Sequence, residues 1–247
     1  MVESLDGFCN FAVAGSKYGE SQFRTAFRFG GEIMMEGTPR NDILVKNDVA
    51  EAKRVKNELG IASNKKLLLY APTLRNENVH KKTSQESRVD ILRTLDALNK
   101  KTGDEWICLM RAHPHISNLI GVSYGDRIKN VTNYEDMAEL LLISDILITD
   151  YSSCAGDFAL LERPIILFQS DIEKYLEEER ALYFEMSESP YYVASSQDEL
   201  ECMINNLDFD EAKENCKDIL KFYGTYESGH ASEAVAKRIA EWVNGVQ

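Results

Sequence analysis

Residues 146–168 read I-L-I-T-D-Y-S-S-C-A-G-D-F-A-L-L-E-R-P-I-I-L-F, and this stretch decides the fold. An apolar strand that ends in Thr149 and Asp150 precedes a small polar turn at Ser152 and Ser153, a helix and a second apolar strand. This is the pattern of one βαβ unit. A helix that begins directly after a buried strand presents free backbone N–H groups and the positive end of its dipole at the turn. With two hydroxyls beside them, the turn predicts a phosphate-binding site.

The rest of the chain continues this alternation of strands and helices. Short apolar runs, typical of parallel strands covered on both faces, predict strands at 67–71, 106–111, 128–131, 146–149 and 165–168. Apolar stripes predict helices near 87–100 and 134–143, and a helical last third from about 196 to 245. In its final helix, Val235, Ile239 and Trp242 mark a predicted buried face. The predicted fold class is α/β, a Rossmann-like doubly wound parallel sheet with its ligand outside the carboxyl ends of the strands.

Length and composition narrow the possible functions. The 247 residues can hold one large α/β domain, or one domain and part of another. A formal net charge of −13 argues against nucleic-acid binding and against a polybasic membrane surface, because both need a basic footprint. No apolar run approaches the ~20 residues that span a bilayer, and nothing resembles a secretory signal, so we expect a cytoplasmic protein. Five cysteines without a C-x-x-C spacing predict reduced thiols.

Several motifs occur in a characteristic order along the chain. Residues 36–44 read E-G-T-P-R-N-D-I-L, residues 67–75 read L-L-L-Y-A-P-T-L-R and residues 109–114 read L-M-R-A-H-P. Together with T-D-Y-S-S, D-F-A-L-L-E-R-P-I-I, Asp171 and Tyr175, they resemble the CDP-glycerol glycerophosphotransferase family, whose members build teichoic-acid-like poly(glycerol phosphate). The resemblance extends over roughly residues 10 to 240.

The resemblance implies a domain organisation and a reaction. The family has two Rossmann-like domains that face each other across a cleft, the GT-B arrangement, and this chain resembles its carboxy-terminal, nucleotide-binding half. Residues 1–45 would be a remnant of the amino-terminal domain with the interdomain crossing, and residues 46–247 the nucleotide-binding domain. The amino-terminal catalytic histidine of the family has no counterpart, because no histidine precedes His80. The implied reaction moves glycerol phosphate, or a related polyol phosphate, from a CDP-activated donor to an acceptor hydroxyl and releases CMP.

The implied partners follow from that reaction. They are CDP-glycerol or a similar CDP-activated polyol as donor, and a polymer or a lipid-linked molecule as acceptor. The resemblance also implies peripheral association with the inner face of the cell membrane through parts that this sequence does not contain. We expect no cofactor.

His113 is the predicted catalytic residue. It follows strand 106–111 directly and lies two residues from Arg111, so both side chains can point to one side of an extended segment. An imidazole there can protonate or stabilise a phosphate oxygen near neutral pH, and the resemblance implies that this histidine is catalytic. The alternative is a histidine that only ends a strand. Arg111 is predicted to bind substrate.

Further residues at the carboxyl ends of the predicted strands form a predicted phosphate-binding site. Ser152 and Ser153 supply hydroxyls, with Thr149 and Asp150 in the same motif, and the resemblance implies that the pyrophosphate binds here. Thr73 and Arg75 follow the first strand of the sheet, where the planar fork of an arginine can hold phosphate oxygens without a metal. The alternative for Arg75 is a surface residue in a polar loop.

Three other positions are predicted with less specific roles. Asp157 is either an acceptor for ribose hydroxyls or a solvated or capping carboxylate. Thr132 and Asn133, which follow strand 128–131, are predicted to meet the base.

We expect no metal site. His113 and His115 imitate a metal pair, but the only other histidines are His80 and His230, and no acidic residue stands at a suitable spacing. Asp208-Phe209-Asp210 imitates a metal-binding D-x-D motif, but it precedes a predicted helix, and Asp208 is interpreted as its N-cap.

One segment departs from the family pattern. Where the family has Asp-Gly followed shortly by an arginine thought to hold phosphate, this chain has Ser228-Gly229, with Ala234 at the arginine position. His230 and Lys237 are the candidate replacements.

Two other functions fit the same sequence. One is a GT-B glycosyltransferase that uses a nucleotide sugar, because the same cleft holds either donor and fold does not fix function. The other is a non-catalytic nucleotide-binding module.

Overall fold

A six-stranded parallel sheet forms the centre of the computed structural model, which describes residues 4–73, 89–112, 125–179 and 181–245. The strands in spatial order are β5 (Ile128–Asn130), β4 (Trp106–Met110), β3 (Lys66–Ala71), β6 (Ile146–Thr149), β7 (Ile165–Phe168) and β8 (Tyr192–Ala194). Every neighbouring pair is parallel. The structure confirms the predicted α/β class and its doubly wound sheet.

The strand order reverses between β3 and β6. From β3 the chain adds β4 and β5 on one side, then returns to add β6, β7 and β8 on the other. In open α/β sheets, ligands bind in the crevice outside the carboxyl ends of the two strands that flank such a reversal. The turns after β3 and β6, which carry Thr73 and Ser152, therefore lie at the position where a ligand is expected.

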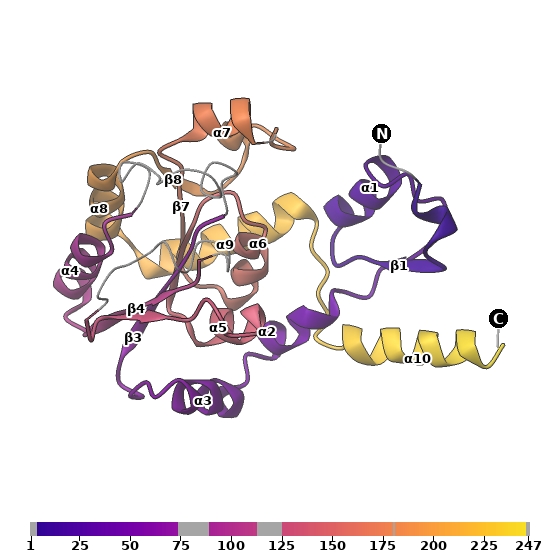
Figure 1. Ribbon diagram of the computed structural model, residues 1–247, viewed down its shortest axis with the longest axis horizontal. Coiled ribbons are helices and arrows are strands. Elements are labelled where there is room, and N and C mark those ends of the chain that lie inside the picture. Colours follow the sequence, from indigo (N-terminus) through magenta and orange to yellow (C-terminus); the bar gives the residue numbers. More distant parts are fainter. Residues whose placement is uncertain (1–3, 74–88, 113–124, 180, 246–247) are drawn as a thin grey trace.

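Helices cover both faces of the sheet (Figure 1). One face packs against α2 (Asp42–Lys46), α3 (Val49–Glu58), α5 (Met137–Ile143), α6 (Cys154–Phe158) and the 3₁₀ turn η6 (Ala159–Leu161). The other packs against α4 (Ile91–Thr102) and α8 (Gln197–Asn206). The long helix α9 (Phe209–Tyr223) contributes to both layers. Leu67 and Leu69 point to the first layer and Leu68 and Tyr70 to the second, the alternation that a strand imposes.

The remaining elements form a smaller part beside this sheet. They are η1 (Leu5–Gly7), β1 (Phe11–Val13), α1 (Lys17–Thr25) and β2 (Glu32–Met34), with β1 and β2 parallel. We call residues 4–34 the small body and residues 42–223 the sheet body. The 3₁₀ turn η2 (Pro39–Asn41) lies in the first connection between them, residues 35–41, and the second connection is residues 224–230. The helix α7 (Ile172–Glu178) and the turn η7 (Met186–Glu188) complete the sheet body.

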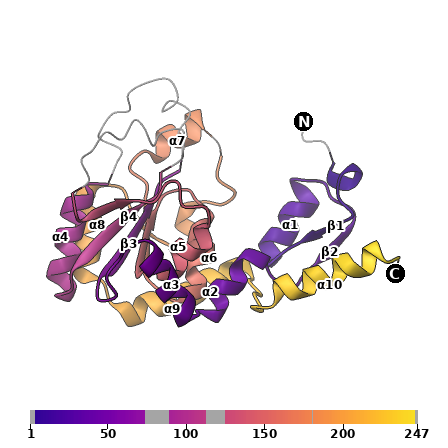
Figure 2. The same ribbon diagram turned by 60° about the horizontal axis from the view of Figure 1, so that its bottom comes forward.

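The last helix, α10 (Ala231–Val243), returns along the small body (Figure 2). Arg238 binds Glu32 at 2.6 Å and stands 5.8 Å from the centroid of the Phe11 ring. The predicted buried face of this helix is wrong, since Ile239 is 47% exposed and Trp242 is 51% exposed. Val235, the third residue of the predicted face, is half-buried, so the described residues cover this face only near the start of the helix.

The other differences concern the ends of elements. All five predicted strands are present, although the second ends at Met110 and the third at Asn130. The first predicted helix runs from Ile91 to Thr102, and the next begins only at Met137 because Asp136 caps it through the Ala138 N–H. The strand β8 was not predicted, because three residues are too short for a periodic signal. Within the described ranges, no helix has both the length and the apolar character to cross a bilayer.

Candidate substrate pocket

A cavity of about 700 Å³ lies where the carboxyl ends of β3, β6 and β7 face the small body. Its polar lining comes from the sheet body, from both connections and from the start of α1. The described polar residues that line it include Ser16, Thr38, Arg40, Asn41, Thr73, Asp150, Ser152, Ser153, Asp157, Gln169 and Glu227. Of the predicted site residues, the cavity brings together Thr73, Asp150, Ser152, Ser153 and Asp157.

The floor of the pocket is the turn that leads into α6. Ser153 occupies the N-cap position, yet its side chain makes no capping hydrogen bond. The Ser152 hydroxyl accepts only a long bond of 3.4 Å from the Cys154 N–H. The backbone N–H groups of Ser152 and Ser153 have no acceptor among the described residues. Two backbone donors and two hydroxyls at the positive end of a helix can therefore all turn to an anion.

Asp150 holds the two strand ends of the pocket together. This residue is 5% exposed, and its carboxylate accepts the Thr73 N–H at 2.9 Å, the Thr73 hydroxyl at 3.1 Å and the Tyr151 N–H at 2.6 Å. Gln169 adds a bond from Nε2 to the Asp150 carbonyl at 3.1 Å. Asp150 therefore orders the turns after β3 and β6 through protein donors.

Thr149 lies beneath this floor. It is 0% exposed, and its hydroxyl donates to the Ala71 carbonyl at 2.6 Å. In this structure it supports the pocket from below and is not part of the lining.

Asp157 faces residues of the first connection. Arg40 donates to it through Nε at 3.1 Å and through Nη2 at 3.2 and 3.0 Å, and Asn41 Nδ2 donates at 2.9 Å. Both carboxylate oxygens therefore have protein donors. The predicted alternatives of a ribose acceptor or a solvated carboxylate did not include this arginine.

Glu227 joins the second connection to the first. It accepts the Thr38 N–H at 2.7 Å and Asn41 Nδ2 at 3.0 Å. Gly15, at the end of β1, packs so closely against Glu227 that a Cβ there would overlap the carboxylate. A larger residue at position 15 would therefore displace the Glu227 carboxylate and the Thr38 hydroxyl, and with them this contact between the small body and the two connections.

Aromatic side chains form the wall on the other side. Tyr151 stacks on Tyr175 with ring centroids 3.6 Å apart and donates to Asp171 at 3.0 Å. Tyr18 of α1 meets Tyr223 of α9 edge to face at 5.3 Å, which ties the small body to the sheet body. Burial, with the nearby Tyr223, raises the pKa of Tyr18 to about 12, so its phenol is neutral and can donate a hydrogen bond at physiological pH.

The remaining predicted residues on this edge do not line the cavity. Arg111 Nη1 donates to the Tyr134 carbonyl at 2.7 Å, and burial lowers the pKa of its guanidinium, which still stays charged. Thr132 is buried and accepts the Ala112 N–H at 3.1 Å, whereas Asn133 is exposed. The charge of the nearby Asp136 partly offsets this effect of burial on the Arg111 pKa.

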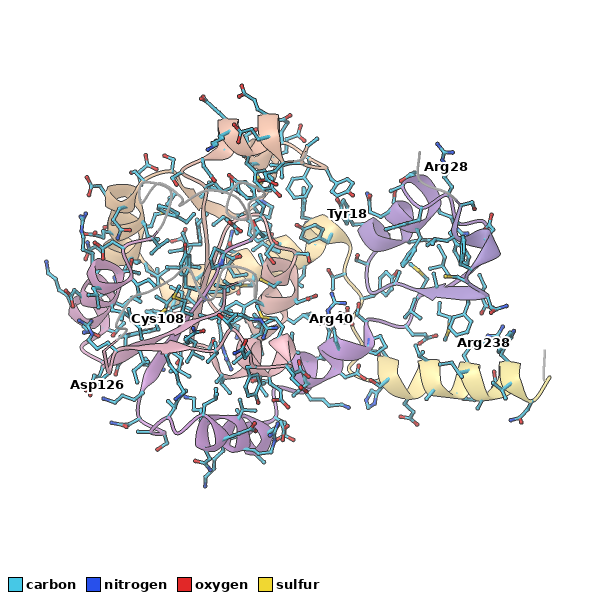
Figure 3. The ribbon with its side chains drawn as sticks, in the orientation of Figure 1. Tyr18, Arg28, Arg40, Cys108, Asp126 and Arg238 are labelled. Atoms are coloured by element: carbon cyan, nitrogen blue, oxygen red, sulfur yellow. The ribbon has the colours of Figure 1, made fainter. Side chains whose placement is uncertain are left out.

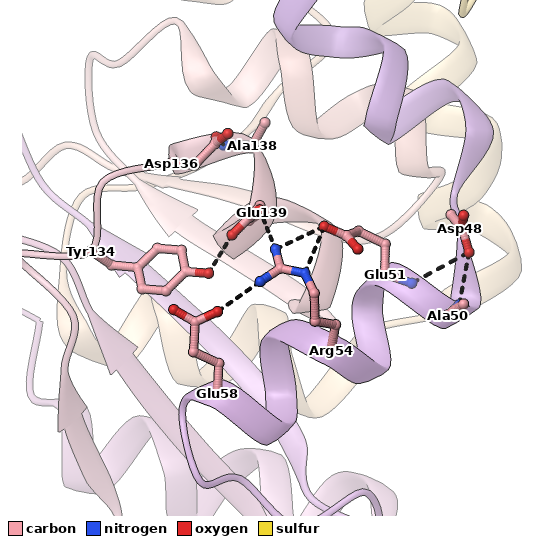
Figure 4. A network of polar contacts seen from close by, with 9 residues as sticks. All are labelled: Asp48, Ala50, Glu51, Arg54, Glu58, Tyr134, Asp136, Ala138 and Glu139. Atoms are coloured by element: carbon pink, nitrogen blue, oxygen red, sulfur yellow. Dashed lines mark hydrogen bonds and ion pairs between the residues drawn. The ribbon is translucent and has the colours of Figure 1, made fainter.

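A polar network fixes the segment that holds Arg111 (Figure 4). The Tyr134 phenol donates to Glu139 of α5, and Glu139 pairs with Arg54 of α3. Arg54 also binds Glu51 and Glu58, each at 2.7 Å. Tyr134 is therefore held from the side of α3 while its carbonyl orients Arg111.

Two predicted site residues, Arg75 and His113, lie outside the described residues, as do His80 and His115. In the part of the chain that is described, no group of three or more His, Cys, Asp or Glu side chains is arranged to hold a metal ion. Asp208 is the N-cap of α9 and accepts the Asp210 and Glu211 N–H groups, as predicted. His230 is largely exposed, and neither it nor Lys237 lines the cavity.

Sequence reasoning missed Arg40, Asn41, Glu227 and the aromatic wall. Arg40 and Asn41 belong to the E-G-T-P-R-N-D motif, which contributes to the family resemblance but by itself indicates no role for either residue. Their partner Asp157 is more than a hundred positions away, so no local spacing signals the contact.

The chain matches known proteins over nearly its whole length. The sequence model of the CDP-glycerol:poly(glycerophosphate) glycerophosphotransferase family matches residues 2–241. A teichoic acid glycerol-phosphate transferase of Staphylococcus aureus is 32% identical over 237 residues, 93% of this chain and 60% of that protein. A teichoic acid poly(glycerol phosphate) polymerase of Staphylococcus epidermidis is 38% identical over 185 residues, 72% of this chain and 25% of that protein.

A solved structure agrees in fold as well as in sequence. The structure of the wall teichoic acid polymerase TagF superposes with a TM-score of 0.82 at 32% identity, covering 96% of this chain and 58% of that one. The chain thus spans between a quarter and three fifths of the length of these three relatives.

Proposed function

Because this chain belongs to the CDP-glycerol:poly(glycerophosphate) glycerophosphotransferase family, we propose that it takes part in transferring glycerol phosphate from CDP-glycerol to an acceptor hydroxyl. CMP is the other product. The acceptor is a teichoic-acid-like polymer or its lipid-linked precursor, and the reaction takes place at the inner face of the cell membrane. In this proposal residues 46–247 form the nucleotide-binding domain, and residues 1–45 belong to the amino-terminal domain and the crossing.

The turn at Ser152 and Ser153 is the observation that carries the proposal. Its N–H groups and hydroxyls stand at the reversal point of the sheet with little or no protein partner, beside a cavity large enough for a nucleotide. A pyrophosphate supplies the oxygens that such donors need. Net charge or fold alone would not lead to this assignment.

The predicted site residues take distinct roles in this proposal. Ser152 and Ser153 are assigned to bind the pyrophosphate, and Asp150 fixes Thr73 at the opposite strand end. Arg75, two residues further along the sequence, is assigned to the same phosphates. We assign Arg111 as a further cation at this edge of the sheet, and Thr132 and Asn133 to the side of the base.

The chemical step is a displacement at phosphorus. Catalysis then depends on aligning the attacking oxygen and on stabilising charge on the phosphate oxygens. We assign His113 to protonate or stabilise the leaving CMP phosphate. Activation of the acceptor hydroxyl is assigned to the amino-terminal domain of the family's longer members.

Binding calorimetry with CDP, CMP, UDP and ADP tests this function. We expect CDP and CMP to bind and UDP and ADP to bind more weakly. Tighter binding of UDP would favour the nucleotide-sugar glycosyltransferase, and the absence of binding at millimolar concentration would contradict the proposal. Release of CMP from CDP-glycerol in the presence of acceptor distinguishes a transferase from a non-catalytic nucleotide-binding module.

A further inference from the structure

The charge of the pocket lining does not match the ligand proposed for it. Among the lining residues that the structure describes, Asp150, Asp157 and Glu227 are acidic, and Arg40 is the one cation. A pyrophosphate or phosphodiester brings negative charge into this cavity, so it needs a positively charged partner as well as neutral donors. Arg40 is in position to supply that charge (Figure 3).

The pairing of Arg40 with Asp157 leaves one edge of the guanidinium free. A guanidinium carries five N–H donors in a rigid plane. Asp157 engages Nε and Nη2, and Nη1 makes no hydrogen bond to any described residue. The side chain of Arg40 is 60% exposed, whereas that of Asp157 is only 17% exposed. The remaining N–H groups of Nη1 and Nη2 form a fork of the kind that binds phosphate oxygens.

The position of Asp157 on α6 brings this fork close to the phosphate turn. Ser153 and Asp157 are four residues apart, so their side chains lie on the same face of the helix with roughly 5–6 Å between Cβ atoms. Side chains on a helix lean toward its N-terminus. An arginine held by Asp157 therefore stands about one helical turn from the free donors of Ser152 and Ser153.

We propose that Arg40 binds a phosphoryl oxygen of the ligand and that Asp157 is the positioning residue that holds its guanidinium over the first turn of α6. The inference rests on the proposed function, because it presumes a phosphate ligand in this pocket. The phosphate belongs either to the pyrophosphate of the donor or to a phosphodiester of the acceptor polymer. Arg40 thus adds the first connection to the ligand site, so that the ligand contacts a segment outside the sheet body.

Calorimetry with Arg40→Ala and a matched control measures this contact. The ligands are CDP, CMP, cytidine and a short oligomer of glycerol phosphate. The control is Arg93→Ala on α4, which removes an arginine that is likewise paired with carboxylates but lies outside the pocket, with Asp198 at 3.0 Å and Glu201 at 2.8 Å. Arg40→Lys retains the charge without the planar fork.

If Arg40 contacts the donor, Arg40→Ala lowers CDP affinity about 10- to 100-fold and leaves cytidine affinity unchanged, since one charge-assisted bond to phosphate is lost. If it contacts the acceptor, the same loss is seen with the oligomer and not with CDP. In either case the affinity of Arg40→Lys lies between those of the wild type and Arg40→Ala, and Arg93→Ala binds like the wild type.

A double-mutant cycle tests the role of Asp157. Asp157→Ala alone should weaken, several-fold, the binding of whichever ligand loses affinity in Arg40→Ala. It should have no further effect when Arg40→Ala is already present, because Asp157 acts through Arg40. An equal effect in both backgrounds means that Asp157 acts independently and overturns its positioning role. Circular dichroism and thermal unfolding identify variants that are misfolded, and Arg40→Lys then carries the test in place of Arg40→Ala.

The result for the wild type separates this inference from the proposed function. Wild-type protein that binds none of the phosphate ligands contradicts the proposed function itself. Wild-type protein that binds them, with Arg40→Ala and Arg40→Lys binding every such ligand equally well, overturns the inference and leaves the proposed function standing.

Discussion

The carboxylate of Asp42 caps helix α10 from 189 residues earlier in the chain, accepting the Ala231 N–H at 2.9 Å through Oδ1. Its Oδ2 accepts the Ser232 N–H at 2.8 Å. His230, at the formal N-cap position, makes no side-chain capping bond. The last helix therefore depends on a residue that directly follows the first connection, which couples the start of the sheet body to α10.

We expect Asp42→Asn to lower the free energy of unfolding by about 1–2 kcal/mol near neutral pH, since an amide oxygen replaces only one of two charged acceptors. Burial acts to raise the pKa of Asp42, but hydrogen bonds from Ser232 and Ala231 outweigh it and lower the pKa. The stabilisation is therefore present above the ordinary aspartate pKa of about 3.9 and is lost as the pH falls below it. Urea unfolding at several pH values measures this, with the exposed Asp104→Asn as control. A difference between wild type and variant that persists at low pH would contradict the assignment.

Replacing both pocket serines should weaken ligand binding with little loss of stability. Each hydroxyl bonded to a charged group contributes about 1.5–3 kcal/mol, so Ser152→Ala with Ser153→Ala should lower CDP affinity at least about tenfold. Ser196→Ala is the matched control, because Ser196 caps α8 through a 3.2 Å bond from the Glu199 N–H. It should cost about 1 kcal/mol of stability and leave CDP binding unchanged. If the double variant instead loses stability and keeps its CDP affinity, Ser152 and Ser153 are structural caps only.

His113→Ala should affect turnover far more than binding. In a form of the protein that catalyses transfer, we expect CMP release to fall about 10²–10⁴-fold, the usual contribution of a general acid. Affinity for CDP should stay within a few-fold of the wild type. The exposed His230→Ala provides the control. Near-normal turnover by a folded His113→Ala variant would show that this histidine only ends a strand.

CDP binding should survive EDTA. The sequence offers no spaced set of oxygen or imidazole ligands suited to Mg²⁺. Calorimetry before and after chelation measures this directly. A loss of about tenfold or more that added Mg²⁺ restores would point to a metal near Asp208, Asp210 or His113.

The cysteines should divide into two reactive and three protected thiols. Burial raises the pKa of Cys154 to about 11 and that of Cys216 to about 12, and it also raises the pKa of Cys108. At pH about 8 the thiolate fraction of Cys154 is therefore on the order of 0.1%. Iodoacetamide should label the exposed Cys9 and Cys202 in the folded protein and all five cysteines after unfolding. Labelling of native Cys154 as fast as Cys202 would mean that the turn below Ser153 opens to solvent.

The sheet could be predicted because its signal is local. The runs 67–71 and 165–168 are apolar throughout and the run 146–149 is apolar up to Thr149, and a strand buried on both faces needs nothing more to be recognised. The carboxyl-edge turn at Ser152 and Ser153 follows from the same local pattern. The strand Tyr192–Ala194 has no comparable signal, because its place in the sheet depends on pairing with β7.

The other half of the pocket could not be predicted from spacing. Arg40 and Asn41 meet Asp157 across more than a hundred residues, and Glu227 meets Asn41 only after the chain has crossed between the bodies twice. The exposure of Ile239 and Trp242 has the same origin, since an apolar stripe on a helix does not specify what packs against it.

The two connections between the bodies run side by side. Thr38 N–H donates to Glu227 at 2.7 Å, and the Ser228 hydroxyl donates to the Glu36 carbonyl at 3.1 Å. The sheet body is thus inserted between β2 and α10 through one narrow neck. Rotation at that neck needs dihedral changes in only two short segments, while the strand pairing of both sheets stays intact. The bridge between Ser16 and Thr225 and the bond from the Lys17 N–H to the Gly224 carbonyl fasten the start of α1 to this neck, so a hinge motion would carry the Ser16 wall of the pocket together with the second connection.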